Sequence, residues 1–206
     1  MIDLRKDGGL WTVTLNRPDK ANSLTAKMLD QLAGIAEAGA QDGDLRALIL
    51  TGTGDRVFSA GADLDAAKAG LAVSPLWERV SGAIAALPCL TVAALNGTLA
   101  GGAFGMALAC DIRLAVPGAK FFYPVAKLGY LPQPSDPARL RALVGPARAR
   151  MILLASQKIG AEEALAWGLV DRIVDPDRLM VSARDLAQAS LEGKPEVLRA
   201  IKSMCM

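Results

Sequence analysis

Two glycine-containing turns, each lying between a strand-like run and a helix-like run, constrain this chain more than any other feature. The first is Ser-Ala-Gly-Ala-Asp at residues 59–63, and the second is Asn-Gly-Thr-Leu-Ala-Gly-Gly at residues 96–102. Such turns can direct two backbone N–H groups at one point, where an oxygen that gains negative charge is stabilised. The pattern predicts strands alternating with helices, and an anion-stabilising site built from these turns.

Composition indicates one globular domain. The chain has 206 residues, of which 52% are hydrophobic, and this length is enough for a sizeable core. Its 23 basic and 21 acidic residues are interspersed and give a formal net charge of +2. We expect no nucleic-acid partner, which would need a basic stripe. We also expect no membrane partner, because no apolar run approaches the roughly 20 residues of a membrane span.

The absence of histidine limits the chemistry further. It excludes Ser-His-Asp and Cys-His catalysis and any histidine-based metal site. The three cysteines, Cys89, Cys110 and Cys205, lack the spacing of metal ligands and fit reduced thiols. Charged residues near the N-terminus are not typical of a signal peptide. We therefore expect a cytoplasmic protein without a metal.

The first two thirds of the chain alternate between strand and helix patterns. Trp11, Val13 and Leu15 alternate with threonines, as in a half-buried strand. Apolar runs predict further strands at residues 47–50, 91–95, 112–115 and 120–123. Helical periodicity or small-residue runs predict helices over residues 24–36, 75–87 and 101–109.

Beyond Pro134 the pattern is mainly helical. Asp136 followed by Pro137 is a strong helix start, because aspartate supplies an N-cap oxygen and proline suits the first helical position. Gly145 and Pro146 then end this helix and begin another, which extends to about residue 155. The sequence further predicts a helix over 162–167, a strand over 169–174, and helices over 177–191 and 194–206.

The chain resembles the crotonase (enoyl-CoA hydratase/isomerase) superfamily over nearly its whole length. The resemblance rests on the order and spacing of short segments: residues 16–18, 22–24, 58–64, 96–102, 109–112, 128–129 with Pro132, 139–140, 144–145, 161–164 and 168–170. It implies an α/β fold, a crotonase-like spiral of repeated ββα units, that acts on acyl-CoA thioesters. It also implies a homotrimer or a dimer of trimers, and no cofactor other than the coenzyme A of the substrate.

Family members are usually longer than this chain. We expect a single crotonase-like domain over residues 1–206, with the spiral core over 1–190 and the start of a truncated, short C-terminal helical region over 191–206.

Carried onto this sequence, the resemblance assigns two oxyanion-hole amides to Ala62 and Gly102. The residues agree, because Gly102 lies at the start of the predicted 101–109 helix, where N–H groups lack internal partners and the helix dipole favours negative charge. Without a Cβ, glycine also lets a ligand oxygen approach the backbone. The alternative is that both turns only permit tight packing. The expected CoA-binding residues are Asn22, Ala60, Ala62, Asp63, Leu64 and Gly102.

This chain lacks the two catalytic glutamates of the hydratases at the corresponding positions. One hydratase glutamate lies three residues after the second oxyanion glycine, which is Gly105 here, and the other position is Val125. Some relatives place an aspartate eight residues further on, where this chain has Gln133, which does not titrate. A pair of carboxylates is what activates water and protonates the α-carbon. The sequence therefore favours isomerisation or a decarboxylation-like step through an enolate over hydration.

Other polar residues are weaker acid–base candidates. Tyr123 shares strand parity with Val125, so that its phenol can enter the same pocket, although a packed core tyrosine is the simpler interpretation. Asp136 is the nearest acid to Gln133, and helix capping is its favoured role. Glu78 is expected on an exposed helical face. The candidates for acid–base or polar roles are Tyr123, Gln133 and Asp136.

These features predict an acyl-CoA thioester enzyme of the hydratase/isomerase family, of isomerase or lyase type. It would stabilise a thioester enolate through the amides of Ala62 and Gly102. The alternative is a non-catalytic acyl-CoA-binding or structural assembly subunit, in which the fold serves oligomerisation. Turnover of any acyl-CoA in a broad panel separates the two.

Overall fold

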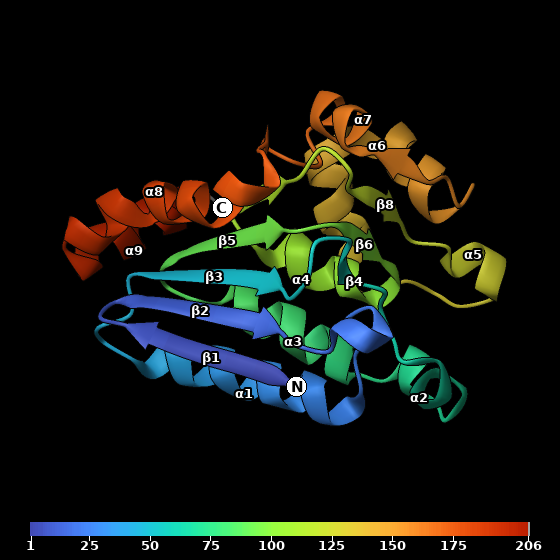
Figure 1. The fold of residues 1–206 in the computed structure, drawn as a ribbon, viewed down its shortest axis with the longest axis horizontal. Coiled ribbons are helices and arrows are strands. Elements are labelled where there is room, and N and C mark those ends of the chain that lie inside the picture. Colours follow the sequence, from blue (N-terminus) through green and yellow to red (C-terminus); the bar gives the residue numbers. More distant parts are fainter. Residues whose placement is uncertain (206) are drawn as a thin grey trace.

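The computed structural model describes residues 1–205. Its strands form two sheets, and helices pack around these sheets (Figure 1). Three successive strand pairs, β3–β4, β5–β6 and β7–β8, each give one strand to each sheet, and helices follow each pair. The larger sheet has the order β1-β2-β3-β5-β7-β10, and the smaller has the order β4-β6-β8-β9. The expected α/β fold of repeated ββα units is confirmed.

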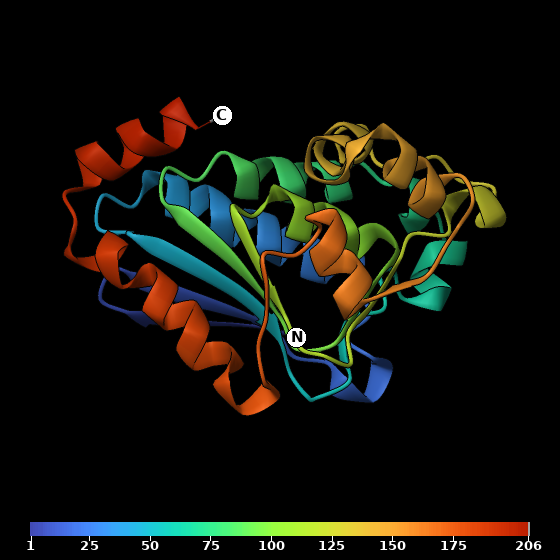
Figure 2. The same ribbon diagram turned by 90° about the horizontal axis from the view of Figure 1, so that it is seen from above.

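The larger sheet is parallel except at its β1 edge. Its strands are β1 (Ile2–Asp7), β2 (Leu10–Leu15), β3 (Ala47–Gly52), β5 (Leu90–Leu95), β7 (Ile112–Ala115) and β10 (Arg172–Ile173). The strand β3 is buried over residues 47–51, as expected for a parallel strand that is covered on both faces. Helices α1, α3 and α4 lie on one face of this sheet and α8 lies on the other (Figure 2).

The smaller sheet places the two glycine turns at one edge. Its strands are β4 (Val57–Ser59), β6 (Thr98–Ala100), β8 (Lys120–Phe122) and β9 (Ile159–Gly160). Strands β4 and β6 are parallel neighbours, so their carboxyl ends lie at the same edge. Each of these ends leads directly into one of the turns, and the turns are therefore brought together by strand pairing.

Most of the helices correspond to the sequence prediction, but α5 was not predicted. They are α1 (Ala26–Gln41), α2 (Leu64–Lys68), α3 (Leu76–Ala85), α4 (Phe104–Ala109), α5 (Val125–Leu128), α6 (Asp136–Leu153), α7 (Ala161–Trp167), α8 (Leu179–Glu192) and α9 (Pro195–Met204). A 3-10 turn, Gly101–Ala103, precedes α4. The predicted end of the last helix, Met206, lies outside the described residues.

One strand was not predicted, and two predicted strands differ from the structure. Strand β1 was not expected, because an exposed edge strand with charged residues lacks the apolar alternation of a half-buried one. The strand predicted over 169–174 is only Arg172–Ile173, and the strand predicted over 120–123 ends at Phe122. Val125 accordingly lies in a helix, α5, and the strand parity assumed for Tyr123 and Val125 does not hold.

The start and the break of α6 lie where the sequence places them. The helix begins at Asp136, with Pro137 in its first turn. Gly145 has a φ of 78° inside the helix, so that α6 consists of two helical segments that meet at a kink. A positive φ favours glycine, which explains the residue found there.

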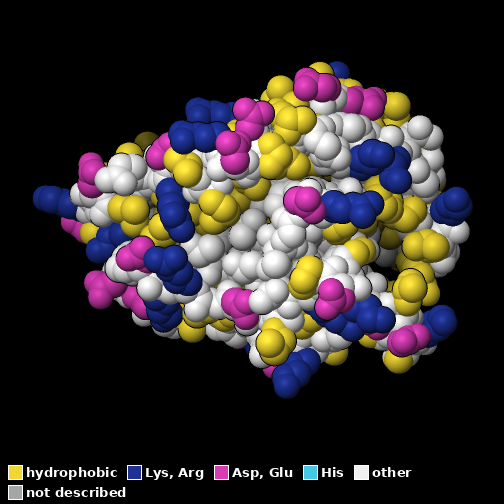
Figure 3. Space-filling model, viewed as in Figure 1, with side chains coloured by type: hydrophobic (Ala, Val, Ile, Leu, Met, Phe, Trp, Pro, Cys, Tyr) yellow, Lys and Arg dark blue, Asp and Glu magenta, His cyan; other side chains and the backbone are white. Residues whose placement is uncertain are grey.

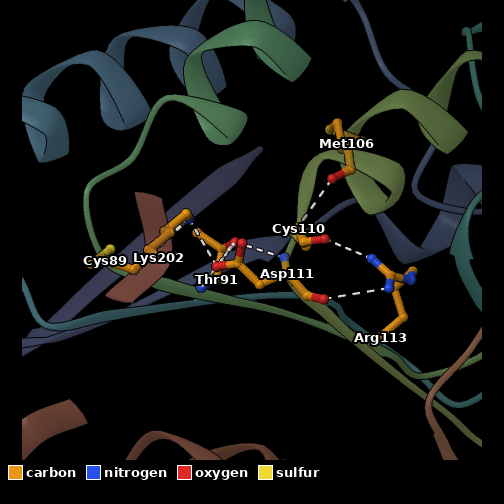
Figure 4. Close-up of polar contacts among 7 residues, drawn as sticks. All are labelled: Cys89, Thr91, Met106, Cys110, Asp111, Arg113 and Lys202. Atoms are coloured by element: carbon orange, nitrogen blue, oxygen red, sulfur yellow. Dashed lines mark hydrogen bonds and ion pairs between the residues drawn. The ribbon is translucent and has the colours of Figure 1, made fainter. Parts of the chain in front are cut away.

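The last helix, α9, is held against the larger sheet by one lysine. The Lys202 ammonium group donates to the Cys89 carbonyl and to Asp111 Oδ2, each at 2.8 Å (Figure 4). Asp111 lies just after α4 and also accepts from the backbone and hydroxyl of Thr91. Nearby, the buried Arg113 guanidinium donates to the Cys110 carbonyl at the end of α4. These contacts fix the C-terminal end of α4.

Among the described residues 1–205, no helix combines the length and the apolarity that crossing a membrane would require.

Candidate active site

The two glycine turns touch one another. Gly61 and Gly101 have φ values of 88° and 57°, a backbone conformation that side chains disfavour. A Cβ on Gly61 would lie 2.9 Å from the Ala100 carbonyl oxygen and 3.4 Å from the Gly102 nitrogen. Glycine is therefore required at position 61 by conformation and by space. The contact holds residue 62 of one turn beside residue 102 of the other.

The amides of Ala62 and Gly102 have no hydrogen-bond partner within residues 1–205. Leu24 holds the first turn by donating to the Gly61 carbonyl and by accepting from the Asp63 amide, which bypasses Ala62. Gly102 is the second residue of a 3-10 turn, where an N–H group has no internal acceptor. Both N–H groups are consequently free to bind an oxygen from a ligand.

A cavity of about 260 Å³ opens beside the two turns. Its walls come from both turns, α2, α3, the end of β8 and the segment 122–133, and none of its lining residues in the described chain is charged. Figure 3 shows hydrophobic side chains around a hollow at the right of the molecule, where Figure 1 places α2 and α5. An apolar cavity with few polar groups is typical of a small-molecule site.

The place of a side chain on Gly102 is taken by an indole ring of the cavity wall. A Cβ at this position would lie 3.1 Å from three atoms of the Trp77 ring. The Trp77 ring is itself fixed, because its Nε1 donates to the Leu71 carbonyl at 2.8 Å. The missing side chain at position 102 therefore makes room for Trp77, and the expectation that it admits a ligand oxygen stays a prediction.

The expected CoA-binding residues divide into two groups. Ala60, Ala62, Leu64 and Gly102 line the cavity. The Asn22 side chain is not in its lining; it accepts from the Arg17 amide and donates to the Val57 carbonyl.

Asp63 has structural partners as well. It caps α2 by accepting from the Asp65 and Ala66 amides, and it pairs with Arg17 at 2.8 Å. The Ala66 amide and then Arg17 lower the pKa of the Asp63 carboxyl. The side chains of Asn22 and Asp63 thus hold the first turn in place.

The three polar candidates come together at one wall of the cavity. The Tyr123 hydroxyl donates to Asp136 Oδ2 at 2.9 Å. The backbone N–H of Gln133 donates to the Tyr123 hydroxyl oxygen at 3.4 Å. Tyr123 and Gln133 line the cavity, whereas Asp136 lies behind Tyr123. Phe104 stacks on the Tyr123 ring at 5.4 Å between centroids and fixes the plane of the phenol.

Asp136 does not cap its helix. The N-cap of α6 is Ser135, and its side chain makes no capping hydrogen bond. The Asp136 side chain is fully buried and turns toward Tyr123 instead. The Asp-Pro pair predicts the start of the helix correctly but not the role of the carboxylate, because the sequence does not show which distant segment packs over it.

Gly105 supplies the space that Asp136 fills. A Cβ on Gly105 would lie 2.8 Å from Asp136 Oδ1 and 3.3 Å from Oδ2. The two positions are far apart in the chain and are brought into contact by the packing of α4 against α6. Any side chain at position 105 would compete with the Asp136 carboxylate for the same volume.

Burial raises the pKa of Asp136 to about 6. The Tyr123 hydroxyl and Arg139 oppose this shift, and Glu78 adds to it. The pKa of Tyr123 is raised well above that of free tyrosine, first by burial and then by the neighbouring Asp136. Perturbed groups beside a cavity are typical of functional sites.

Glu78 is half-buried, which corrects the expectation of an exposed helical face. Its carboxylate accepts from the backbone amide and from the hydroxyl of Ser135, at the start of α6. The neighbouring Arg79 is exposed and pairs with Glu37 and Asp30 of α1. Glu78 therefore binds the N-terminus of α6 from α3.

Comparison with known proteins decides the family. The model of the enoyl-CoA hydratase/isomerase family matches residues 5–206. The chain belongs to this family. A curated relative, carnitinyl-CoA dehydratase of Escherichia coli, is 36% identical over 209 residues, which cover 98% of this chain and 79% of the relative.

Solved structures agree with the family assignment. DspI of Pseudomonas aeruginosa is 33% identical with a TM-score of 0.91, and the match covers 99% of this family member and 85% of DspI. An enoyl-CoA hydratase of Bacillus anthracis is 30% identical with a TM-score of 0.89, covering 98% of this chain and 81% of that one.

Proposed function

We propose that this member of the enoyl-CoA hydratase/isomerase family binds an acyl-CoA thioester and stabilises its enolate through the amides of Ala62 and Gly102. The observation that carries the proposal is the contact of the two turns, which leaves two unpartnered N–H groups beside one cavity. Two such donors stabilise a carbonyl oxygen more as it becomes an oxyanion than in the ground state.

The apolar wall of the cavity supports a thioester substrate. Its lining residues carry no charge in the described chain, so that an acyl group would replace water there. A low local dielectric strengthens the hydrogen bonds from the amides to the developing negative charge. The phosphate groups of coenzyme A would remain outside this cavity.

The reaction we propose is of isomerase or lyase type. Hydration needs two acid–base groups that handle water and the α-carbon, whereas positions 105 and 125 hold glycine and valine. An isomerase moves one proton between two carbons of the same substrate, and a decarboxylating lyase delivers one proton to the enolate. Either reaction fits a cavity with one polar wall.

A non-catalytic acyl-CoA-binding or assembly subunit is the second candidate. It is favoured by one observation, which is that no carboxylate belongs to the cavity lining within residues 1–205. Such a protein would bind acyl-CoA without exchanging its α-protons. Cytoplasmic location is a further part of the proposal and rests on the scattered cysteines.

Exchange of α-protons for deuterium tests the enzyme hypothesis without knowledge of the natural acyl group. Butyryl-CoA, 3-hexenoyl-CoA and crotonyl-CoA would be incubated with the protein in D₂O and followed by NMR. We expect exchange or double-bond migration with at least one thioester, and hydration of crotonyl-CoA well below the ~10⁴ M⁻¹s⁻¹ of efficient enzymes. Binding without exchange would favour the non-catalytic alternative, and efficient hydration would contradict the proposed reaction type.

Two substitutions at Gly102 form a matched pair that isolates its N–H group. Both Gly102→Ala and Gly102→Pro add a Cβ against Trp77, but only proline removes the donor. We expect the proline variant to lose a further 10²–10³-fold in exchange rate relative to alanine, because one oxyanion donor has about this effect. Equal rates at equal folded fraction, checked by melting temperature, would contradict the role of this amide.

A further inference from the structure

Asp136 is a buried carboxylate with an incomplete set of partners. It is fully buried, and Oδ2 accepts from the Tyr123 hydroxyl, while Oδ1 has no hydrogen-bond partner among residues 1–205. A buried carboxylate that only stabilises a fold is normally paired or saturated with hydrogen bonds, because an unsatisfied one costs several kcal/mol. This incomplete bonding indicates a role other than stability.

The surroundings of Asp136 connect it to the cavity through a single group. Behind it, Gly105 leaves the space that its Oδ1 fills. In front of it, the Tyr123 hydroxyl lies between the carboxylate and the cavity that Tyr123 lines. The backbone amide of Gln133 donates to the same hydroxyl from the other side and holds its position.

We infer that Tyr123 is the catalytic residue that exchanges a proton with the substrate carbon, and that Asp136 is the positioning residue behind it, which takes up the phenolic proton of Tyr123 and returns it. This inference rests on the proposed function, since it requires an enolate in the cavity. It assigns the acid–base chemistry to a linked pair instead of to side chains at positions 105 and 125.

The proposed step moves one proton and breaks one C–H bond. The bond from the α-carbon to hydrogen breaks, and its electron pair forms the enolate, whose oxygen accepts from the Ala62 and Gly102 amides. The proton passes to the Tyr123 hydroxyl oxygen as the original phenolic proton passes to Asp136 Oδ2. In an isomerisation the reverse sequence delivers a proton to the γ-carbon, and the pair returns to its starting state.

The charges around the pair suit this task. Glu78 of α3 and Arg139 of α6 act on Asp136 in opposite directions, and Gly105 of α4 adds no charge. Burial is the largest influence and raises the pKa of Asp136 to about 6, closer to neutral pH than that of an ordinary carboxyl group. A base with a pKa close to the working pH transfers protons efficiently in both directions.

Four variants test the inference. Asp136→Asn keeps the shape but removes the base, Tyr123→Phe breaks the connection, and Gly105→Ala places a methyl 2.8 Å from Asp136 Oδ1. The matched controls are Asp185→Asn on the exposed face of α8 and Gly82→Ala in α3, where a Cβ meets no atom within 4 Å. Asp136→Glu provides the conservative rescue, because it restores a carboxylate.

We expect Asp136→Asn and Tyr123→Phe to lower the α-proton exchange rate by 10²–10⁴-fold, with the KM of the thioester changed less than threefold. The wild-type rate should rise with pH around 6 as Asp136 ionises, and this rising limb should vanish in Asp136→Asn. The exchange rate of Gly105→Ala should be lower than that of the Gly82→Ala control. Asp136→Glu should recover part of the wild-type rate and of its pH dependence.

The outcomes separate the inference from the proposed function. A wild-type protein that exchanges α-protons while Asp136→Asn keeps its rate and its pH profile would overturn the linked pair and leave the proposed function standing. A change in melting temperature alone, with kcat intact, would show a structural role and overturn the inference as well. A wild-type protein that exchanges no α-proton from any thioester in the panel would overturn both.

Discussion

Burial disfavours the charged form of the Asp136 carboxyl group and so makes the stability of the protein depend on pH. In the unfolded chain this carboxyl group ionises near pH 4, whereas in the folded protein burial raises the pKa to about 6. Between these two values the folded state retains a proton that the unfolded state has lost. Stability should therefore fall as pH rises from about 4 to about 6, and it should stay lower at neutral pH.

Asp136→Asn should consequently stabilise the protein at neutral pH. The amide resembles the protonated carboxyl group and carries no charge to bury, so we expect an increase of about 2–3 kcal/mol in the free energy of unfolding at pH 7. The difference from the wild type should shrink toward zero near pH 4. Urea unfolding at four pH values between 4 and 7 measures this. A variant whose stability runs parallel to the wild type would contradict the raised pKa.

The sequence identifies the members of the site but not how they are linked. Tyr123, Gln133 and Asp136 are recognisable as polar residues in a segment that approaches the cavity. Their linkage depends on the contact between Gly105 and Asp136, which joins two helices. Local patterns describe neighbours along a chain, and an Asp-Pro pair has the same appearance whether its carboxylate caps the helix or faces a distant glycine.

At the scale of elements, apolar periodicity predicts the interior better than the edges. The central strands β3 and β5 and the helix α3 lie close to their predicted ranges, because their burial imposes a regular pattern, and α1 is found where it was predicted but extends to Gln41. Strand β1 escapes prediction because it is an exposed edge whose position is set by pairing with β2. The sequence predicts the start of helix α9, but it does not predict the attachment of this helix through Lys202.

Lys202→Met should loosen α9 from the larger sheet. The ammonium group donates to the Cys89 carbonyl and to Asp111, and hydrogen bonds of charged groups contribute about 1.5–3 kcal/mol. We expect a loss of about this size in the stability of α9, seen as faster hydrogen exchange of its amides by mass spectrometry. The exposed Lys194→Met is the control. Unchanged exchange in α9 would show that apolar packing alone holds the helix.

At the scale of the whole molecule, several large apolar side chains remain exposed. On α9 these are Val197, Ile201 and Met204, and around the cavity they are Leu64, Leu128 and Leu131. Exposed apolar groups that gather in patches are common at protein interfaces. Together with the family assignment, they support the proposal that the protein is a homotrimer or a dimer of trimers.

Light scattering coupled to size-exclusion chromatography tests the assembly. The chain has a mass of 21.5 kDa, and we expect a particle of three or six times this mass at micromolar concentration. Charged substitutions at Val197 and Ile201, made together, should lower the mass if α9 takes part in the interface. A particle of one chain mass for the wild type would contradict the prediction.

The contact between the two turns has a consequence for how this protein can change. A Cβ on Gly61 would collide with the Ala100 carbonyl of the other turn, and Gly101 has a positive φ that side chains disfavour, so the part of the site that would hold the oxyanion has almost no freedom to vary. The wall with Tyr123 and Gln133, backed by Asp136, is built from side chains instead of backbone amides, so it can be altered without disturbing the two turns. New reactions should therefore be reached by altering that wall, and a library for directed evolution gains most from diversity there.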